Sequence, residues 1–447
     1  MSARANSKRL IWFLLGLGFH LQLVASLSIT ELVVLLWAPC VIFQEVPYMR
    51  RNGVMPLFWM ALFMFIGCVA SSLYNHAVFA QALRGLAVTS LFPCSIVVGH
   101  FLFRRDPKNY GFLLLGSAIS FFACTFVFQS SFETNSLAGG ARGAEAVKDI
   151  MSGPIYWITR LGSLVTVWPR GWYLSCPMSY CAVAPIAFSA FAVLTSASGR
   201  SAALASMAGV CLVLIGRKKQ SSMKRLARNF WILCFVGFIG IFAVNKIYKH
   251  AAMAGLLGEE AHEKYIKQTR GGTGVISLLI GGRLDSFAGL LACRDRPIIG
   301  YGPWAIDSNN YYEEFLRKYG AQEDYDDYVE LEKYRQASGR PKLIPCHSHI
   351  VSSWINFGLP GLLFWLYVLF VVFRFARQDS WVIPQFFYFL VSLIPGFLWS
   401  IFFSPISDRV MPAFFCVAML LARAVRLGRH RLPIDMQIQI WRNENAR

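Results

Sequence analysis

The chain alternates long apolar runs with short polar connectors, and this pattern breaks once, late in the sequence, at a long polar passage. A helix that spans a membrane needs roughly 17 to 25 mostly apolar residues. Apolar runs of this kind predict helices at residues 11–27, 31–47, 54–73, 86–103, 110–128, 154–169, 175–194, 201–216, 230–245, 361–377, 382–400 and 409–425. We therefore expect an all-α polytopic membrane protein with about 12 transmembrane helices.

Two of these runs have a second interpretation. The run at residues 154–169 is interrupted by Arg160 and also fits a helix that lies in the membrane interface. The run at residues 11–27 follows several basic residues, as a signal peptide does. The many later spans, and the lack of a convincing small-residue cleavage site, favour a retained first helix.

The polar passage covers residues 271–361 and is called the polar segment below. Residues 275–293 carry apolar side chains at helical spacing, and a Gly-Gly pair within them places Arg283 at a helix start. Residues 311–335 predict a second helix, and residues 347–357 predict a short third helix that ends at a glycine. We expect the polar segment to be a small solvated domain.

Composition agrees with a membrane protein. Hydrophobic residues make up 56% of the 447 residues and the mean hydropathy is +0.47, whereas soluble proteins are roughly 45 to 50% apolar. The net charge of +19 does not indicate nucleic-acid binding, because the basic residues are spread over short connectors between apolar runs. Most of the 11 cysteines lie inside apolar runs and no CxxC spacing occurs, so no zinc or redox motif is visible.

The distribution of Lys and Arg predicts the orientation in the membrane. These residues are concentrated in alternate connectors, which places both termini in the cytoplasm and puts the polar segment and Arg200 on the opposite face. In a bacterium that face is the periplasm. The expected domains are an N-terminal bundle of about nine helices at residues 1–245, a periplasmic loop domain at residues 246–360, and C-terminal helices with a basic cytoplasmic tail at residues 361–447.

Arg200 and Arg283 are the first candidates for ligand binding. An arginine side chain stays charged and presents a planar fork of donors that matches phosphate oxygens. Small residues around Arg200 allow a large ligand to approach the backbone. Each arginine also has an ordinary explanation, since Arg200 could anchor a helix at headgroup level and Arg283 could simply be solvated.

His347 and His349 are candidates of a different kind. On a helix, side chains two residues apart point about 200° from each other, so the two histidines are not expected to act together. Without a third ligand nearby, a metal site is not expected either. Gly300-x-Gly302 lacks the GK[ST] ending and the preceding strand of a phosphate-binding loop, and we do not interpret it as one.

Cys293 and Cys346 are the two cysteines well inside the polar segment, and two states are open for them. In an oxidising compartment they could form a disulfide that ties the helix after Arg283 to the residue before His347. They could equally remain two buried thiols.

Several short motifs, taken in order, resemble a known family. They are Ser198-Gly199-Arg200-Ser201-Ala202, Gly282-Arg283, Asp295-Arg296-Pro297-Ile298-Ile299-Gly300-Tyr301-Gly302, and His347-Ser348-x-Ile350 ending at Gly358-Leu359-Pro360-Gly361-Leu362. This set is similar to the O-antigen ligase and O-antigen polymerase superfamily over about residues 180–375. The sequence departs from the family at Ser348, where Asn is preferred, and between residues 303 and 346, which have no clear counterpart.

The resemblance implies a GT-C-like glycosyltransferase in the bacterial inner membrane, with its active site on the periplasmic face. Members take a glycan from an undecaprenyl diphosphate carrier and join it to a sugar acceptor such as lipid A core, with no cofactor or metal. The resemblance implies that Arg200 and Arg283 hold the diphosphate and that His347 is the base. Further candidates for substrate contact lie in or near the same motifs and face: Arg84, Arg296, Ser348 and His349.

Three functions compete at this point. A ligase that passes the glycan to a separate acceptor is favoured by the single large loop late in the chain, and its single displacement would invert the anomeric carbon. An O-antigen or exopolysaccharide polymerase, which extends the lipid-linked glycan, is the main alternative. A polysaccharide transporter or flippase would need ionisable residues at mid-depth in the membrane, and these are sparse.

Overall fold

The computed structural model describes the N-terminal helices, most of the polar segment and the C-terminal helices. The described residues are 27–104, 284–320, 322–337, 341–375, 384–403 and 410–430, with shorter pieces within 11–24, 110–120 and 250–254. The predicted spans at residues 154–169, 175–194, 201–216 and 230–245 lie outside the described residues, and so do Arg200 and Arg283.

Three long apolar helices form the N-terminal part of the described fold: α2 (Ile29–Arg51), α3 (Met55–Tyr74) and α4 (Phe79–Phe103). A capping box fixes the start of α2, because the Ser28 hydroxyl accepts from the Glu31 N–H and the Glu31 carboxylate accepts from the Ser28 N–H. All three helices are long and apolar enough to cross a membrane. The second, third and fourth predicted spans are therefore confirmed as helices, and their length and composition are consistent with crossing a membrane.

The first predicted span is wrong as a continuous helix. Its C-terminal part contains β1 (Gln22–Val24), which pairs antiparallel with β2 (Leu27–Ser28). Ser28 is held extended, with φ −77° and ψ 159°, because it is the N-cap of α2. The strands occupy only residues 22–24 and 27–28, and over so short an apolar stretch the pattern alone does not separate a strand from the end of a helix.

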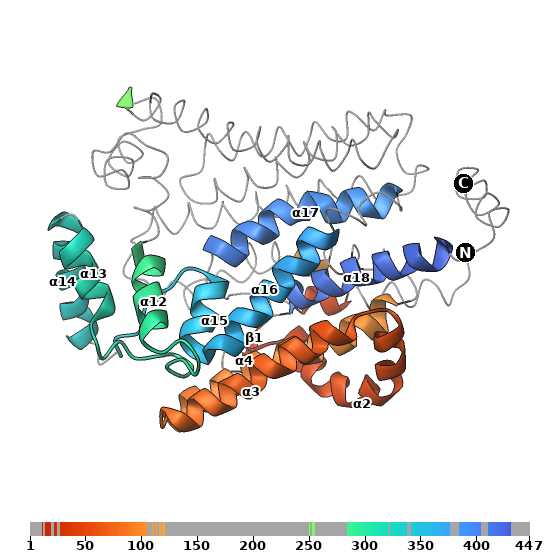
Figure 1. The fold of residues 1–447 in the computed structure, drawn as a ribbon, viewed down its shortest axis with the longest axis horizontal. Coiled ribbons are helices and arrows are strands. Elements are labelled where there is room, and N and C mark those ends of the chain that lie inside the picture. Colours follow the sequence, from red (N-terminus) through yellow and green to blue (C-terminus); the bar gives the residue numbers. More distant parts are fainter. Residues whose placement is uncertain are drawn as a thin grey trace.

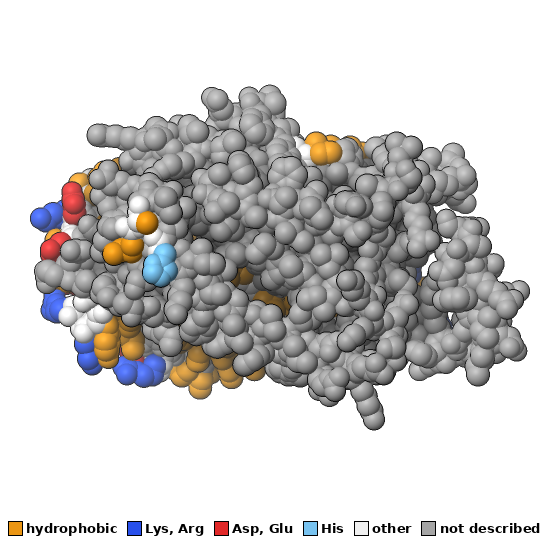
Figure 2. Space-filling view, turned by 90° about the horizontal axis from the view of Figure 1, so that it is seen from above, with side chains coloured by type: hydrophobic (Ala, Val, Ile, Leu, Met, Phe, Trp, Pro, Cys, Tyr) orange, Lys and Arg blue, Asp and Glu red, His pale blue; other side chains and the backbone are white. Residues whose placement is uncertain are grey.

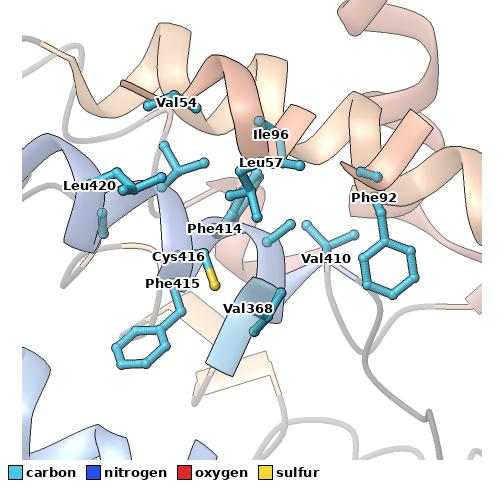
Figure 3. Close-up of a cluster of buried hydrophobic side chains, with 14 of the residues drawn as sticks. Val54, Leu57, Phe92, Ile96, Val368, Val410, Phe414, Phe415, Cys416 and Leu420 are labelled. Atoms are coloured by element: carbon cyan, nitrogen blue, oxygen red, sulfur yellow. The ribbon is translucent and has the colours of Figure 1, made fainter. Parts of the chain in front are cut away.

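Three helices form the C-terminal part of the described fold, in agreement with the last three predicted helices: α16 (Leu359–Arg374), α17 (Pro384–Phe403) and α18 (Met411–His430). Helix α16 packs on α3, and α18 packs on α4. Figure 3 shows part of the shared hydrophobic core, with Leu57, Phe92 and Phe414 among its members. Phe92 meets Phe364 and Trp365 edge to face, with ring centroids 5.1 and 5.8 Å apart. Helices far apart in the sequence thus share one core.

The described part of the polar segment contains shorter helices: α12 (Leu284–Asp295), α13 (Tyr311–Tyr319), α14 (Gln322–Ala337) and α15 (His349–Phe357). Helices α12 to α14 gather at one end of the described fold (Figure 1), and the charged side chains visible in Figure 2 lie at the same end. The division of the chain into three domains stays a prediction.

The single helix predicted at residues 311–335 is wrong, because two helices, α13 and α14, occupy this stretch. Helix α13 ends at Gly320, whose N–H donates to the Leu316 carbonyl at 2.7 Å. A Cβ at Gly320 would lie 2.3 Å from that carbonyl oxygen, so a larger residue would not fit there. The glycine thus allows the chain to turn between two helices whose polar sequences look continuous.

A buried ionic cluster joins α2 to the end of α4 that lies away from the polar segment. The Glu45 carboxylate bonds to His100 Nδ1 at 2.7 Å and pairs with Arg104 at 3.3 Å. His100 Nε2 lies 3.0 Å from the Asn52 side-chain nitrogen. Glu45 and His100 are completely buried, and a buried carboxylate is tolerated only with partners of this kind.

Removal of the Glu45 carboxylate is expected to destabilise the fold. Glu45→Ala takes away the shared partner of His100 and Arg104, at a cost of about 3–5 kcal/mol. The midpoint of thermal unfolding in detergent should fall clearly. Glu314→Ala is the matched control, since Glu314 is exposed on α13, and it should change the midpoint little. Equal midpoints for the two variants would contradict a stabilising role for the cluster.

Candidate active site

His347 lies at the surface of the polar segment, beside the start of α12. Its imidazole Nδ1 is hydrogen-bonded to the Asp285 carboxylate, and its backbone N–H donates to Ser286 Oγ at 3.3 Å. The His347 side chain is 54% exposed, whereas the Asp285 side chain is 12% exposed. The imidazole is therefore open to a ligand while a largely buried carboxylate holds it.

Two chain segments bring this pair together. Helix α12 begins at Leu284, directly after Arg283, so that Asp285 lies in its first turn. Residues 341–347 run back beside residues 305–307, where the Ile344 N–H donates to the Ala305 carbonyl at 2.9 Å. This return places His347 at the N-terminal end of α12.

His347 lies outside the short helix, which was predicted to begin there but begins at His349. Ser348 is the N-cap of α15, because its hydroxyl accepts from the Val351 N–H at 3.4 Å and also donates to the Ile401 carbonyl of α17 at 3.2 Å. Serine and asparagine are both preferred N-caps. The departure from the family motif at Ser348 thus preserves the capping chemistry.

His349 occupies a different environment from His347. It is 3% exposed, and its ring centroid lies 4.9 Å from that of Trp365 on α16. The geometry agrees with the expectation that the two histidines do not act together. In the part of the chain that the structure describes, no group of three His, Cys, Asp or Glu side chains is arranged to hold a metal ion.

Arg84 and Arg296 both lie against aromatic rings of the loop at residues 296–304. The Arg84 guanidinium is 4.5 Å from the Trp304 ring centroid, and the Arg296 guanidinium is 4.7 Å from the Tyr301 ring centroid. Arg296 also donates to the Asn75 side-chain oxygen. Such cation–π contacts fix the guanidinium groups. The two arginines therefore help to hold this loop on α3 and α4, and their contact with substrate stays a prediction.

The loop at residues 298–302 crosses the end of α15 at backbone distance. The N–H groups of Tyr301 and Gly302 donate to the carbonyls of Ile355 and Asn356 at 2.7 and 3.1 Å, and the Leu359 N–H donates to the Ile298 carbonyl at 2.9 Å. These loop donors are used within the protein. That use agrees with our rejection of Gly300-x-Gly302 as a phosphate-binding loop.

Glycines make this crossing possible. Gly300 has a φ of +75° and Gly358 has a φ of +66° with a ψ of −152°, a backbone conformation that only glycine adopts readily. A Cβ on Gly358 would lie 2.0 Å from the Ile298 carbonyl oxygen, and a Cβ on Gly300 would lie 2.6 Å from the Gly358 nitrogen. The glycines of the two motifs thus allow the backbone of the loop to pack closely against the backbone at the end of α15.

Cys293 and Cys346 are free thiols in a small cluster of buried side chains with Ala292, Ile344 and Ile355. Burial raises the pKa of Cys293 to about 12, and the neighbouring Cys346 adds to this shift. Burial also raises the pKa of Cys346 to about 12. Of the two states open from the sequence, the structure has the free thiols, with Cys293 buried and Cys346 partly buried.

Sequence reasoning missed Asp285 and Asn75. Asp285 falls two residues after Arg283 at a helix start, where an acidic residue is common because it complements the helix dipole. That ordinary explanation hides its contact with His347. Asn75 is separated from Arg296 by 221 residues, and no local pattern links positions so far apart.

The fold and the site together define a class: a helical membrane protein that presents an exposed imidazole, backed by a carboxylate, in a polar segment between apolar helices. Residues 184–366 match the family model described as O-antigen ligase. The match covers less than half of the chain, and over these residues it confirms the resemblance found in the motifs. None of the curated proteins matches the chain.

The matched stretch contains every candidate site residue except Arg84, including Arg200, Arg283 and His347. The family is associated with ligase or polymerase activity on lipid-linked glycans in a membrane setting. The family match thus indicates a glycosyltransferase-like ligase or polymerase activity.

Substitution of Gly358 tests the backbone crossing. Gly358→Ala introduces both a strained backbone conformation, at about 1–3 kcal/mol, and a collision with the Ile298 carbonyl. We expect a large fall in the yield and unfolding midpoint of the purified protein.

Gly53→Ala is the matched control for this variant. Gly53 has a similar φ of +70°, but no atom lies within 4 Å of the position that an added methyl group would take, so only the backbone strain applies. A loss of stability no greater in Gly358→Ala than in Gly53→Ala would show that the crossing is not tightly packed.

Proposed function

We propose that this protein is a membrane glycosyltransferase of the O-antigen ligase type, which moves a glycan from undecaprenyl diphosphate to a sugar acceptor such as lipid A core. The observation that carries the proposal is the exposed imidazole of His347, held by Asp285 in the helix that follows Arg283. The family match supports the class of reaction. We place the reaction on the periplasmic face of the bacterial inner membrane.

The first task of such an enzyme is to stabilise the leaving diphosphate. Negative charge grows on a phosphate oxygen as the bond to the sugar breaks. Arg200 and Arg283 would stabilise this charge by donating hydrogen bonds from their guanidinium groups. A preorganised donor of this kind is worth about 10²- to 10³-fold in rate. Peptide geometry keeps the Cα atoms of Arg283 and Asp285 within about 7 Å of each other. Because Arg283 is two residues before Asp285 in the sequence, we propose that it acts together with His347.

The second task is to remove a proton from the acceptor. The acceptor hydroxyl oxygen attacks the anomeric carbon, its proton passes to His347, and the bonding electrons of the old bond leave with the diphosphate. A general base contributes about 10²- to 10⁴-fold. A single displacement inverts the anomeric carbon. The reaction written in this way balances without a cofactor or a metal.

The decisive experiment supplies the detergent-purified full chain with an undecaprenyl-diphosphate-linked glycan and a lipid A core acceptor, in buffer with EDTA. The expected result is release of undecaprenyl diphosphate and formation of glycosylated acceptor, both detected by mass spectrometry.

A ladder of longer glycans on the carrier would instead identify a polymerase. Movement of the intact donor across proteoliposomes, with no release of carrier, would identify a flippase. Activity that is lost with EDTA and restored by a divalent ion would overturn the metal-free mechanism.

His347 and His349 should respond differently to substitution. His347→Ala removes an exposed imidazole, so kcat should fall roughly 10²-fold or more while the unfolding midpoint changes little. His349→Ala removes a buried ring that packs on Trp365, so its main effect should be a lower unfolding midpoint. Near-normal turnover in His347→Ala would show that the reaction uses no base at this position.

The arginines should require their forked geometry as well as their charge. Arg200→Lys and Arg283→Lys keep the charge but lose the fork, so both should lose most transferase activity while the protein still folds. Arg317→Lys is a matched control, because Arg317 forms an exposed ion pair with Glu313 on α13, which contributes little. Turnover in Arg283→Lys as high as in Arg317→Lys would mean that a point charge is sufficient.

A further inference from the structure

The contact between Asp285 and His347 can orient the imidazole ring of His347. In a neutral imidazole one ring nitrogen carries the proton and donates, while the other accepts. Nδ1 of His347 faces the carboxylate of Asp285, and an ionised carboxylate only accepts hydrogen bonds. The proton of the neutral ring is therefore held on Nδ1, and the lone pair on Nε2 is left for an incoming hydroxyl group.

We propose that Asp285 is the positioning residue for His347: it fixes the tautomer with the proton on Nδ1, aims Nε2 at the acceptor, and stabilises the imidazolium that forms. This inference rests on the proposed function, because it assigns Asp285 to the same reaction. In that step the hydroxyl proton moves to Nε2 as the oxygen bonds to the anomeric carbon. Asp285 keeps its negative charge throughout and takes no proton.

The surroundings of the pair distinguish it from an ordinary surface ion pair. Exposed pairs contribute little because both side chains remain mobile and solvated. Here the Asp285 side chain is only 12% exposed, and it lies in the first turn of α12, a regular helix. A largely buried carboxylate on a helix has few other orientations open to it.

The backbone of His347 is held on both sides. Its own N–H donates to Ser286 Oγ at 3.3 Å. The next residue, Ser348, is buried, caps α15 and donates to the Ile401 carbonyl of α17. With the backbone fixed and Nδ1 bonded to Asp285, the direction of Nε2 is set. Preorganisation of this kind is what a general base requires.

The test combines a spectroscopic and a kinetic measurement on the full chain in detergent micelles. Histidine labelled with ¹⁵N reports which ring nitrogen carries the proton, and the His347 signals are identified by their loss in His347→Gln. In the wild-type protein at a pH where His347 is neutral, the proton should be on Nδ1. Asp285→Asn offers an amide that can donate to Nδ1, so the proton should move toward Nε2.

The kinetic arm measures transfer from the lipid-linked glycan. Asp285→Asn should lower kcat roughly 10²-fold and leave KM little changed, because the substrate does not touch Asp285. Asp285→Glu keeps the acceptor and should recover part of the rate, which also provides a second variant if the amide impairs folding. Ser286→Ala is the control, since it removes a neighbouring hydrogen bond without changing the acceptor for Nδ1, and it should retain the Nδ1 proton.

The outcomes separate this inference from the proposed function. An unchanged tautomer in Asp285→Asn, whether or not kcat falls, overturns the positioning role while wild-type transfer activity stands. A normal kcat in Asp285→Asn overturns it equally. If the wild-type protein transfers no glycan, the proposed function fails on its own, and the tautomer measurement still decides whether Asp285 orients His347. A shifted tautomer with a lowered kcat and rescue by glutamate supports the inference.

Discussion

The structure depends on the crossing of two backbones, where residues 298–302 lie directly on residues 355–359. No side chain fits between them, so Gly300 and Gly358 are required by distance as well as by φ. The crossing is tied to α3 by two further hydrogen bonds, since the Ser71 hydroxyl donates to the Asn356 carbonyl at 3.0 Å and the Asn75 amide donates to the Gly300 carbonyl at 3.1 Å. A polar segment is thereby joined to apolar helices through main-chain atoms, which are the least adjustable part of a protein.

The geometry of the candidate site depends on this backbone crossing. Helix α12 leads into the crossing and α15 ends at it, so the start of α12 and the chain just before α15 are held at a fixed separation. Asp285 and His347 occupy those two positions. The same loop is held on α4 by Arg84, which lies over the Trp304 ring, and at the end of α3 by Arg296, which donates to the Asn75 side-chain oxygen. Arg84 and Arg296 therefore contribute to the packing on which the position of His347 depends.

The apolar helices could be predicted because burial in a membrane requires an unbroken apolar run of sufficient length, and α2, α3 and α4 satisfy this. The division at Gly320 was missed because polar sequence on both sides of it fits a helix equally well. His347 was found through its motif, whereas Asp285 was not, because an acidic residue at a helix start has an ordinary electrostatic explanation. The partners of Asp285 and Asn75 lie far along the chain. Pairings that depend on the folded backbone leave no periodic signal in the sequence.

The free thiols of Cys293 and Cys346 are expected to react slowly with oxidants. Only the thiolate attacks a disulfide, and burial raises the pKa of both thiols to about 12, so little thiolate is present at neutral pH. Exchange with an external oxidant would then be slow even where disulfides are stable. Slow exchange would let the two cysteines persist as reduced, space-filling side chains beside α12 and α15.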